Sequence, residues 1–237
     1  MISAGLDIRA FFTTREGGAS ASPYASLNVA DHVGDDPVAV EHNRRRVSDL
    51  AQAPVSFLTA VHGITVAHVS TAGAVPPPAD VLVTSTPGVA LAAIAADCLP
   101  VLIHDEASGA VAAAHVGREG LYRGTLDAAV AALLDIRGGW RVPGHLHASI
   151  GPGICGRCYE VPADMRDRVA ARHPVARATT RQGTPSLDLP RAAEARLGEL
   201  GFTQIVRHRA CTREDPRWFS LRRDGTTGRH AGVIVAP

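Results

Sequence analysis

Four short runs rich in apolar residues lie close together in the centre of the chain, and they restrict the fold more than any other feature. They are residues 80–84, 89–95, 101–103 and 111–116. Each run is shorter than a typical helix and is rich in small or β-branched residues, which favours strands. Strands that are apolar on both faces are covered on both sides. The sequence therefore predicts buried central strands, with a hairpin turn at residues 105–109.

Helical patterns flank this region. Asp36 and Pro37 are typical of a helix start, because Asp accepts hydrogen bonds from free N–H groups and Pro suits the first turn. This helix is expected to end near Leu50, and Leu and Val recur at helical spacing from residue 124 to 136. Further helices are expected at residues 162–172 and 190–200, and further strands at residues 146–150, 203–206 and 232–235. Because strands and helices alternate, the predicted fold class is α/β (or α+β), in a single domain spanning residues 1–237.

Charge and composition disfavour several classes of protein. The chain has 24 Lys and Arg against 23 Asp and Glu, and aromatic residues make up 4%. Nucleic-acid binding usually needs a basic face, so no nucleic-acid partner is expected. No stretch reaches the roughly 20 apolar residues of a membrane span, and the N-terminus shows no secretion signal. We therefore expect a cytoplasmic protein without a membrane partner, whose cysteines are reduced.

Three side chains that bind metals interrupt the small-residue stretches. His115 lies near the end of the run 111–116, Cys98 follows Asp97 after another run, and His62 lies upstream. Two imidazoles and a thiolate are suitable zinc ligands, and a catalytic zinc keeps three protein ligands and one open position. Their spacing is not a local motif, because the three residues would meet only in the folded chain. The alternative is that each histidine is a hydrogen-bonded structural residue.

Cys98 also fits a second role that needs no metal. A cysteine beside a histidine acts as a nucleophile when the histidine is its base, here His115. Asp97 is then a candidate for orienting the imidazole. The local sequence does not separate this interpretation from the metal site.

Two further patterns contain reactive or cationic residues. Cys155 and Cys158 form a single CxxC pair, a spacing found in redox sites and in half of a zinc site. Cys211 is isolated in the sequence, and the residues around the pair do not resemble a redox helix start, so a structural or packing role is expected. Residues 117–120 and 222–225 combine Gly with Arg and can offer N–H groups and guanidinium groups to an anion. Surface turns are the ordinary interpretation of both segments.

Taken in order, these segments resemble the YfiH family, whose members are also called laccase-domain proteins, polyphenol oxidase-like proteins or peptidoglycan editing factors. The resemblance covers nearly the whole chain. The matching segments are residues 12–18, 26–28, 32–36, 43–44, 61–63, 80–84, 96–100, 115–117, 151–152, 158–161, 187–189, 211–212, 219–220 and 222–225.

The resemblance implies a layered α/β sandwich of mixed β-sheets flanked by helices. It also implies a metal site formed by His62, Cys98 and His115, with Zn as the expected metal and copper as the second candidate. Two positions depart from the family pattern. Ala60 stands where Gln is common, and Arg118 and Glu119 stand where Trp and Arg are common. We therefore expect the metal ligands to be retained and the substrate side of the site to differ.

The leading hypothesis is a zinc-dependent purine nucleoside phosphorylase with adenosine deaminase activity. Its substrates would be phosphate and adenosine, inosine, guanosine or methylthioadenosine, and its products free base and ribose 1-phosphate. The resemblance and the local sequence together make Cys98, His115 and Asp97 the catalytic candidates, with Asp97 orienting a ligand histidine. The candidates for substrate and phosphate binding are Arg44, Arg118 and Asn28, of which Arg44 is the stronger cation candidate.

Three other functions stay open. The first is a hydrolase that edits peptidoglycan precursors with Cys98 as nucleophile and His115 as base. The second is a non-catalytic nucleotide-binding protein. The third is a copper-dependent polyphenol oxidase, which is the least supported because His145 and His147 form a His-X-His pair without a second pair. The expected partners are a nucleoside and phosphate, and the expected assembly is a monomer or homodimer.

Overall fold

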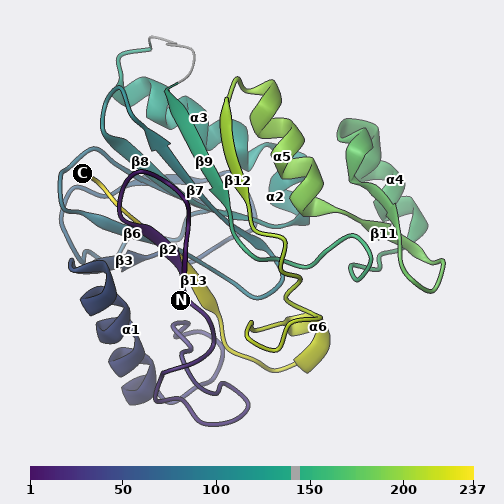
Figure 1. Cartoon of the computed structure of the whole chain (residues 1–237), viewed down its shortest axis with the longest axis horizontal. Helices are drawn as coiled ribbons and strands as arrows, with labels where there is room; N and C mark the ends of the chain where they lie inside the picture. Colours follow the sequence, from purple (N-terminus) through teal and green to yellow (C-terminus); the bar gives the residue numbers. More distant parts are fainter. Residues whose placement is uncertain (140–144) are drawn as a thin grey trace.

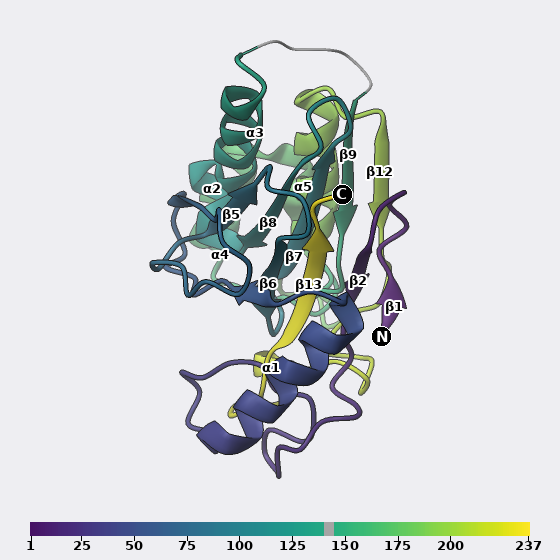
Figure 2. The same cartoon turned by 90° about the vertical axis from the view of Figure 1, so that its left-hand side faces the viewer.

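The computed structural model describes residues 1–139 and 145–237, and its two larger β-sheets pack face to face (Figures 1 and 2). The strand order of the five-stranded sheet is β1 (Ile2–Ser3), β2 (Ala10–Phe12), β13 (His230–Val235), β6 (Ala90–Ala95) and β3 (Val55–Phe57). The order of the six-stranded sheet is β12 (Gln204–Arg207), β9 (Leu146–Ile150), β7 (Leu99–Asp105), β8 (Ala110–Val116), β5 (Val81–Thr84) and β4 (Val66–His68). Both sheets combine parallel and antiparallel pairs, so the predicted mixed α/β class is confirmed.

The central strands are buried on both faces because each face has a different neighbour. In β7, Val101 and Ile103 pack in one core with the helices outside the six-stranded sheet, whereas Leu102 packs in the core between the two sheets. In β8, Ala112 belongs to the outer core and Ala113 to the inner one. Burying a Val, Leu or Ile side chain contributes about 1.5–3 kcal/mol, so these strands hold the layers together.

Helices cover the outer faces of both sheets. α1 (Pro37–Ala51) packs on the five-stranded sheet, and α3 (Thr125–Ile136) and α5 (Leu189–Glu199) pack on the six-stranded sheet (Figure 2). α4 (Ala163–Arg172) lies beside a small sheet formed by β10 (Arg177–Thr179) and β11 (Pro185–Leu187). The short helix η1 (Pro174–Ala176) connects α4 to β10. Within the described residues, no helix combines the length and apolarity needed to cross a membrane.

The predicted start of the first helix and the predicted hairpin turn at residues 105–109 are both confirmed. The Asp36 carboxylate accepts a hydrogen bond from the N–H of Val38 at 3.0 Å and caps α1. The N–H of Gly109 donates to the carbonyl of Asp105 at 2.8 Å in the predicted hairpin turn between β7 and β8.

The interpretation of residues 117–120 and 222–225 as surface turns is correct in part, because residues 222–225 lie at the surface, but neither segment is a simple turn. Most of these residues lie in two short helices, α2 (Arg118–Arg123) and α6 (Leu221–Asp224). Both helices are too short to show a helical period in the sequence. α2 is stabilised by tertiary packing instead, because Leu121 is buried in the core outside the six-stranded sheet.

Candidate metal centre

His62, Cys98 and His115 meet at one end of the sandwich, although they come from three separate segments. His62 lies in the loop between β3 and β4, Cys98 in the loop between β6 and β7, and His115 near the end of β8. One ligand atom from each residue lies within 4.8 Å of the others. The two imidazole rings are 5.0 Å apart between centroids and nearly perpendicular, at 82°. The fold thus brings together the three residues predicted as ligands.

Asp80, directly before β5, holds two of these segments in place. Its carboxylate accepts hydrogen bonds from the backbone N–H groups of Val61 and Thr65, each at 3.1 Å. These bonds fix the loop in which His62 adopts a left-handed backbone with φ of 59°. The carbonyl of Asp80 also accepts the N–H of His115 at 2.8 Å. The sequence signal for this residue is a single acid directly before the apolar run of residues 81–83.

The hydrogen bonds of His115 leave one ring nitrogen free for a ligand. Its Nδ1 lies 2.8 Å from the carbonyl oxygen of Ile94, so Nδ1 carries the proton. Its Nε2 is buried and has no hydrogen-bond partner among the described residues. Burial lowers the pKa of His115, which favours the neutral imidazole. A buried acceptor without a partner is unfavourable, and a metal ion would satisfy it.

The three ligand atoms face a space that Gly117 leaves open. A Cβ atom at Gly117 would lie 2.9 Å from the sulfur of Cys98, 3.5 Å from Nδ1 of His62 and 3.8 Å from Nε2 of His115. The backbone of Gly117 has φ of −88°, so the absence of a side chain matters for space and not for conformation. Two imidazole nitrogens and one sulfur around an open space fit zinc, and the arrangement leaves a side free for a further ligand.

The environment of Cys98 also fits a bound cation. Burial, together with the neighbouring Asp97 charge, raises the pKa of the Cys98 thiol to about 12, although Arg229 and Arg118 act in the opposite direction. Without a cation the thiol therefore keeps its proton near neutral pH. A coordinating metal removes that proton. This environment supports a ligand role for Cys98 more than a role as a free nucleophile.

The candidate metal centre opens into a pocket of about 130 Å³ that also contains Arg229. Burial lowers the pKa of Arg229, but Cys98 and Asp97 contribute in the opposite direction as negative charges. Its Nη1 donates to the carbonyl oxygens of Thr227 and Gly228 at 2.8 and 3.0 Å. Arg229 is thus a fixed cation beside the ligands. No sequence motif marked it, because a single Arg before a strand is an ordinary feature.

Asn28, predicted to bind substrate, instead positions the backbone of Arg229. Its side-chain oxygen accepts the N–H groups of Arg229 at 2.9 Å and Ala30 at 3.0 Å. Its Nδ2 donates to the carbonyl of Ala30 and to the carboxylate of Asp35. Because both ends of the buried amide are engaged within the protein, Asn28 acts on the pocket through Arg229.

Arg44, the favoured phosphate ligand in the sequence, lies outside this pocket. Its Nε donates to the carbonyl of Val29 at 2.8 Å, and its Nη2 lies 3.1 Å from the Asp31 carboxylate. Its guanidinium stacks on Phe57, 4.8 Å from the ring centroid. Arg44 therefore stabilises the packing of α1, and a direct role in phosphate binding is not supported by its position.

Arg118 lies near Cys98 but shares its charge with Glu119. Its Nη1 is 3.2 Å from the Glu119 carboxylate, which also contacts Arg123 at 3.0 Å and Arg168 at 3.4 Å. Burial and the Cys98 charge raise the pKa of Tyr159, whereas Arg118 lowers it as a cation and hydrogen-bond partner. The residues that replace the family's usual pair thus form an arginine–glutamate cluster beside the candidate metal centre.

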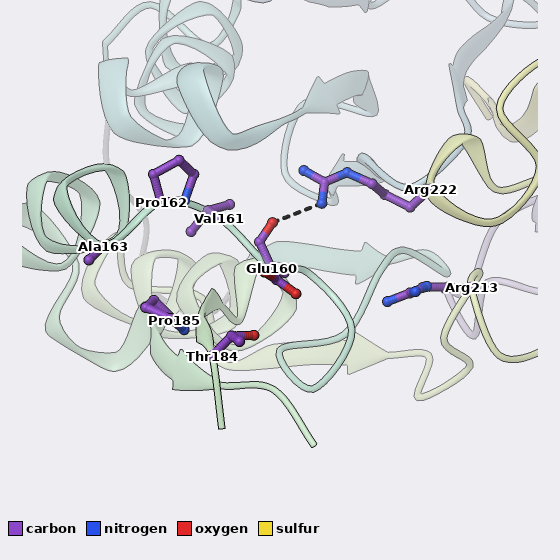
Figure 3. A pocket seen from close by; sticks show the side chains of 8 residues that line it. All are labelled: Glu160, Val161, Pro162, Ala163, Thr184, Pro185, Arg213 and Arg222. Carbon is purple, nitrogen blue, oxygen red and sulfur yellow. Dashed lines mark hydrogen bonds between the residues drawn. The ribbon is translucent and has the colours of Figure 1, made fainter. Parts of the chain in front are cut away.

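A larger hollow, whose lining includes Glu160, Arg213 and Arg222, is separate from the candidate metal centre. It has a volume of about 660 Å³, and Figure 3 shows Arg213 and Arg222 extending toward it from the same side. Arg222 donates to the carbonyl of Glu160 at 2.8 Å. Among the described residues that line this hollow, none is a ligand of the candidate metal centre. Its size alone therefore does not make it the substrate site.

Asp97 ties the Cys98 loop to the C-terminal part of the chain. Its Oδ1 accepts the hydroxyl groups of Thr212 at 2.6 Å and Ser220 at 2.7 Å, and its Oδ2 accepts the N–H of Arg222 at 2.7 Å. The predicted contact with a ligand histidine is not found, since Nδ1 of His115 bonds to a backbone carbonyl instead. Asp97 therefore positions Cys98 through the backbone.

We expect Asp97→Asn to lower the free energy of unfolding by about 1–3 kcal/mol, because buried hydroxyl and N–H donors lose a charged acceptor. Asn tolerates the left-handed backbone found here, where φ is 91°. The effect should therefore report the hydrogen bonds and not backbone strain. Chemical denaturation measures it, with the exposed Asp49→Asn on α1 as control. Equal stability of the two variants would contradict the role assigned to Asp97.

The fold and the site define a layered α/β sandwich protein with a candidate three-ligand metal centre. The chain belongs to the YfiH family, whose model, described as multi-copper polyphenol oxidoreductase laccase, matches residues 9–237. The resemblance seen in the sequence is thereby confirmed.

Three relatives illustrate the match. A Streptomyces coelicolor protein named purine nucleoside phosphorylase is 46% identical over 228 residues, covering 94% of this chain and 93% of the relative. The structure of a Neisseria meningitidis protein is 36% identical, with a TM-score of 0.84 over 96% of this chain and 94% of the other. The structure of Bacillus licheniformis YfiH is 30% identical, with a TM-score of 0.85 over 96% and 92% of the two chains.

Proposed function

We propose that this chain is a metal-dependent purine nucleoside phosphorylase, with zinc as the metal and adenosine deamination as a second activity. The observation that carries the proposal is the open-sided cluster of His62, Cys98 and His115 beside the fixed cation Arg229. The relative that is 46% identical over most of both chains and is named purine nucleoside phosphorylase supports the reaction class.

In this proposal His62, Cys98 and His115 hold the metal, and Arg229 binds phosphate. When bound, zinc supplies a Lewis acid that stabilises negative charge on the reacting groups. Phosphorolysis breaks the bond between the purine nitrogen and the ribose, and its electron pair leaves with the base, which takes up the proton that the attacking hydrogen phosphate gives up. A phosphate oxygen then forms the new bond to the ribose. Arg229 fixes the phosphate by charge-assisted hydrogen bonds and so orients this attack.

The shape of the pocket limits how a nucleoside can enter. A space of about 130 Å³ is smaller than the roughly 300–1,000 Å³ of typical ligand sites, so only the reacting part of the substrate fits inside. Ile94 and Ala96 form an apolar wall suited to an uncharged ring. The half-exposed Leu221 and His32 also line this pocket, and the remainder of the nucleoside would lie on their side of it.

The test is an assay of purified protein with inosine or adenosine and phosphate, with and without a chelator. Free base and ribose 1-phosphate should form only with phosphate and should disappear with the metal, while ammonia release from adenosine reports deamination. Turnover of a peptidoglycan precursor that survives chelation would instead favour the Cys98 hydrolase. Nucleoside binding without any product would favour a non-catalytic protein. Oxidation of phenols by dioxygen would favour the copper enzyme.

We expect Arg229→Met to raise the KM for phosphate roughly 10–100-fold, because hydrogen bonds to charged groups contribute about 1.5–3 kcal/mol. Arg229→Lys should lose less, since it keeps the charge. Steady-state kinetics with varied phosphate measure the effect, and metal content shows whether the centre is intact. Arg44→Met is the matched control and should leave this KM unchanged. The opposite ranking of Arg229 and Arg44 would overturn the assignment of the anion site.

A further inference from the structure

A second group of metal-binding side chains lies outside the site described so far. It consists of Cys155, Cys158, Cys211 and Glu214, and one ligand atom from each lies within 4.8 Å of the others. Zinc bound tetrahedrally to sulfur at about 2.3 Å separates its ligand atoms by about 3.8 Å. Closing the observed group around an ion therefore needs shifts of about 1 Å. We propose that these four residues form a closed, structural zinc site.

The two halves of this group have the same backbone geometry. The carbonyl of Cys155 accepts the N–H groups of Cys158 and Tyr159 at 2.9 and 3.0 Å. The carbonyl of Cys211 accepts those of Glu214 and Asp215 at 3.1 and 2.9 Å. Each turn thus presents two metal-binding side chains three residues apart in the sequence, which is the spacing of paired ligands in structural zinc sites. The isolated cysteine of the sequence is the first ligand of the second pair.

Backbone pairing holds the two turns side by side. Gly153 forms a parallel bridge with Cys211, and the N–H of Thr212 donates to the carbonyl of Gly153 at 3.2 Å. The N–H of Cys155 donates to the sulfur of Cys211 at 3.3 Å. N–H groups directed at sulfur favour a thiolate ligand. The four donors therefore converge because of backbone structure and not through flexible side chains alone.

The surroundings compensate the negative charge of such a site. Cys158 Sγ lies 3.1 Å from Oε1 of Glu214, and the Arg181 guanidinium lies 2.7 Å from the same oxygen. Arg213 donates to the carbonyl of Cys158 at 3.1 Å. Cys158 and Cys211 are buried, and all four cysteines of the chain are free thiols. A thiolate-rich set of four donors selects zinc and leaves no open position for a substrate.

The second site would brace the candidate metal centre. The N–H of Ile154 donates to the carbonyl of Asp97 at 2.9 Å, and the hydroxyl of Thr212 donates to its carboxylate at 2.6 Å. Both turns are therefore attached to the loop that carries Cys98. An ion bound by both Cys155 and Cys211 would therefore stabilise the position of this loop. This inference does not depend on the proposed phosphorolysis.

The test measures the zinc content of the wild-type chain and of variants of the two sites. Each protein is first loaded with zinc, and gel filtration then removes unbound zinc. The wild-type chain should hold two zinc ions, one in each group of ligands. His115→Ala and Cys211→Ser should each hold one, and the double variant none. If Cys211→Ser does not fold, Glu214→Gln is the substitute variant, because it keeps the shape of a half-exposed side chain. It should weaken the retention of one zinc ion.

Cobalt loading identifies which site remains, because each thiolate ligand adds charge-transfer absorption. His115→Ala should keep the strong absorption of three thiolates, whereas Cys211→Ser should keep only that of Cys98.

Two results would overturn the proposal. One is a wild-type chain with a single zinc ion that His115→Ala loses completely. The other is a disulfide among Cys155, Cys158 and Cys211 in the purified protein, seen by mass spectrometry after alkylation.

Discussion

Cys98→Ala should lose the metal ion of the candidate metal centre and lower kcat/KM for phosphorolysis by about 10³-fold. A metal ion contributes several kcal/mol to stabilising charge in a transition state, and about 4 kcal/mol corresponds to this factor. Without a cation the Cys98 thiol keeps its proton, because burial and the Asp97 charge raise its pKa to about 12. Metal analysis and steady-state kinetics on the same preparation measure both effects.

The control for Cys98→Ala is the wild-type chain after chelation. Its activity should fall to the level of the variant and return when zinc is added, whereas the variant should not respond. Unchanged phosphorolysis in Cys98→Ala would refute the proposed function. A variant that keeps the ion but loses phosphorolysis would show that Cys98 acts in catalysis and is not a metal ligand.

Gly117→Ala should have nearly the same effect through a single added methyl group. That Cβ would lie 2.9 Å from the sulfur of Cys98, a distance at which an atom must move. The nearby nitrogens of His62 and His115, at 3.5 and 3.8 Å, leave the sulfur little room among the ligands. We expect loss of the ion and a decrease in kcat/KM approaching that of Cys98→Ala. The fold should persist, since φ of −88° is compatible with alanine.

Gly198→Ala on α5 is the matched control for this prediction. Apart from its chain neighbours and the backbone of the helix itself, no atom lies within 4 Å of a Cβ at that position. Alanine in a helix stabilises relative to glycine by roughly 0.5–1 kcal/mol, so this variant should keep its metal and activity and unfold at a slightly higher temperature. Full metal content and activity in Gly117→Ala would show that the three ligand atoms do not enclose an ion at this place.

The residue types suggest the three metal ligands, and the family resemblance then favours that interpretation over structural histidines. The spacing of His62, Cys98 and His115 carries no local signal, since the three segments meet through β-strand pairing. The sequence favours Arg44 over Arg118 as the cation and gives no signal for Arg229, yet the fold directs Arg44 toward Asp31 and Phe57. Arg229 enters the pocket because β13 pairs with β6, which precedes the Cys98 loop.

The sequence by itself determined the elements whose causes are local. Continuous apolar runs predicted the buried strands, Asp36 and Pro37 predicted the start of α1, and the helical period after residue 124 predicted α3. The tertiary structure decided which polar side chains meet, including the pairing of the CxxC turn with Cys211 and Glu214. The physical reason is range: caps, turns and periods act within a few residues, whereas a site depends on loops brought together by packing and strand pairing.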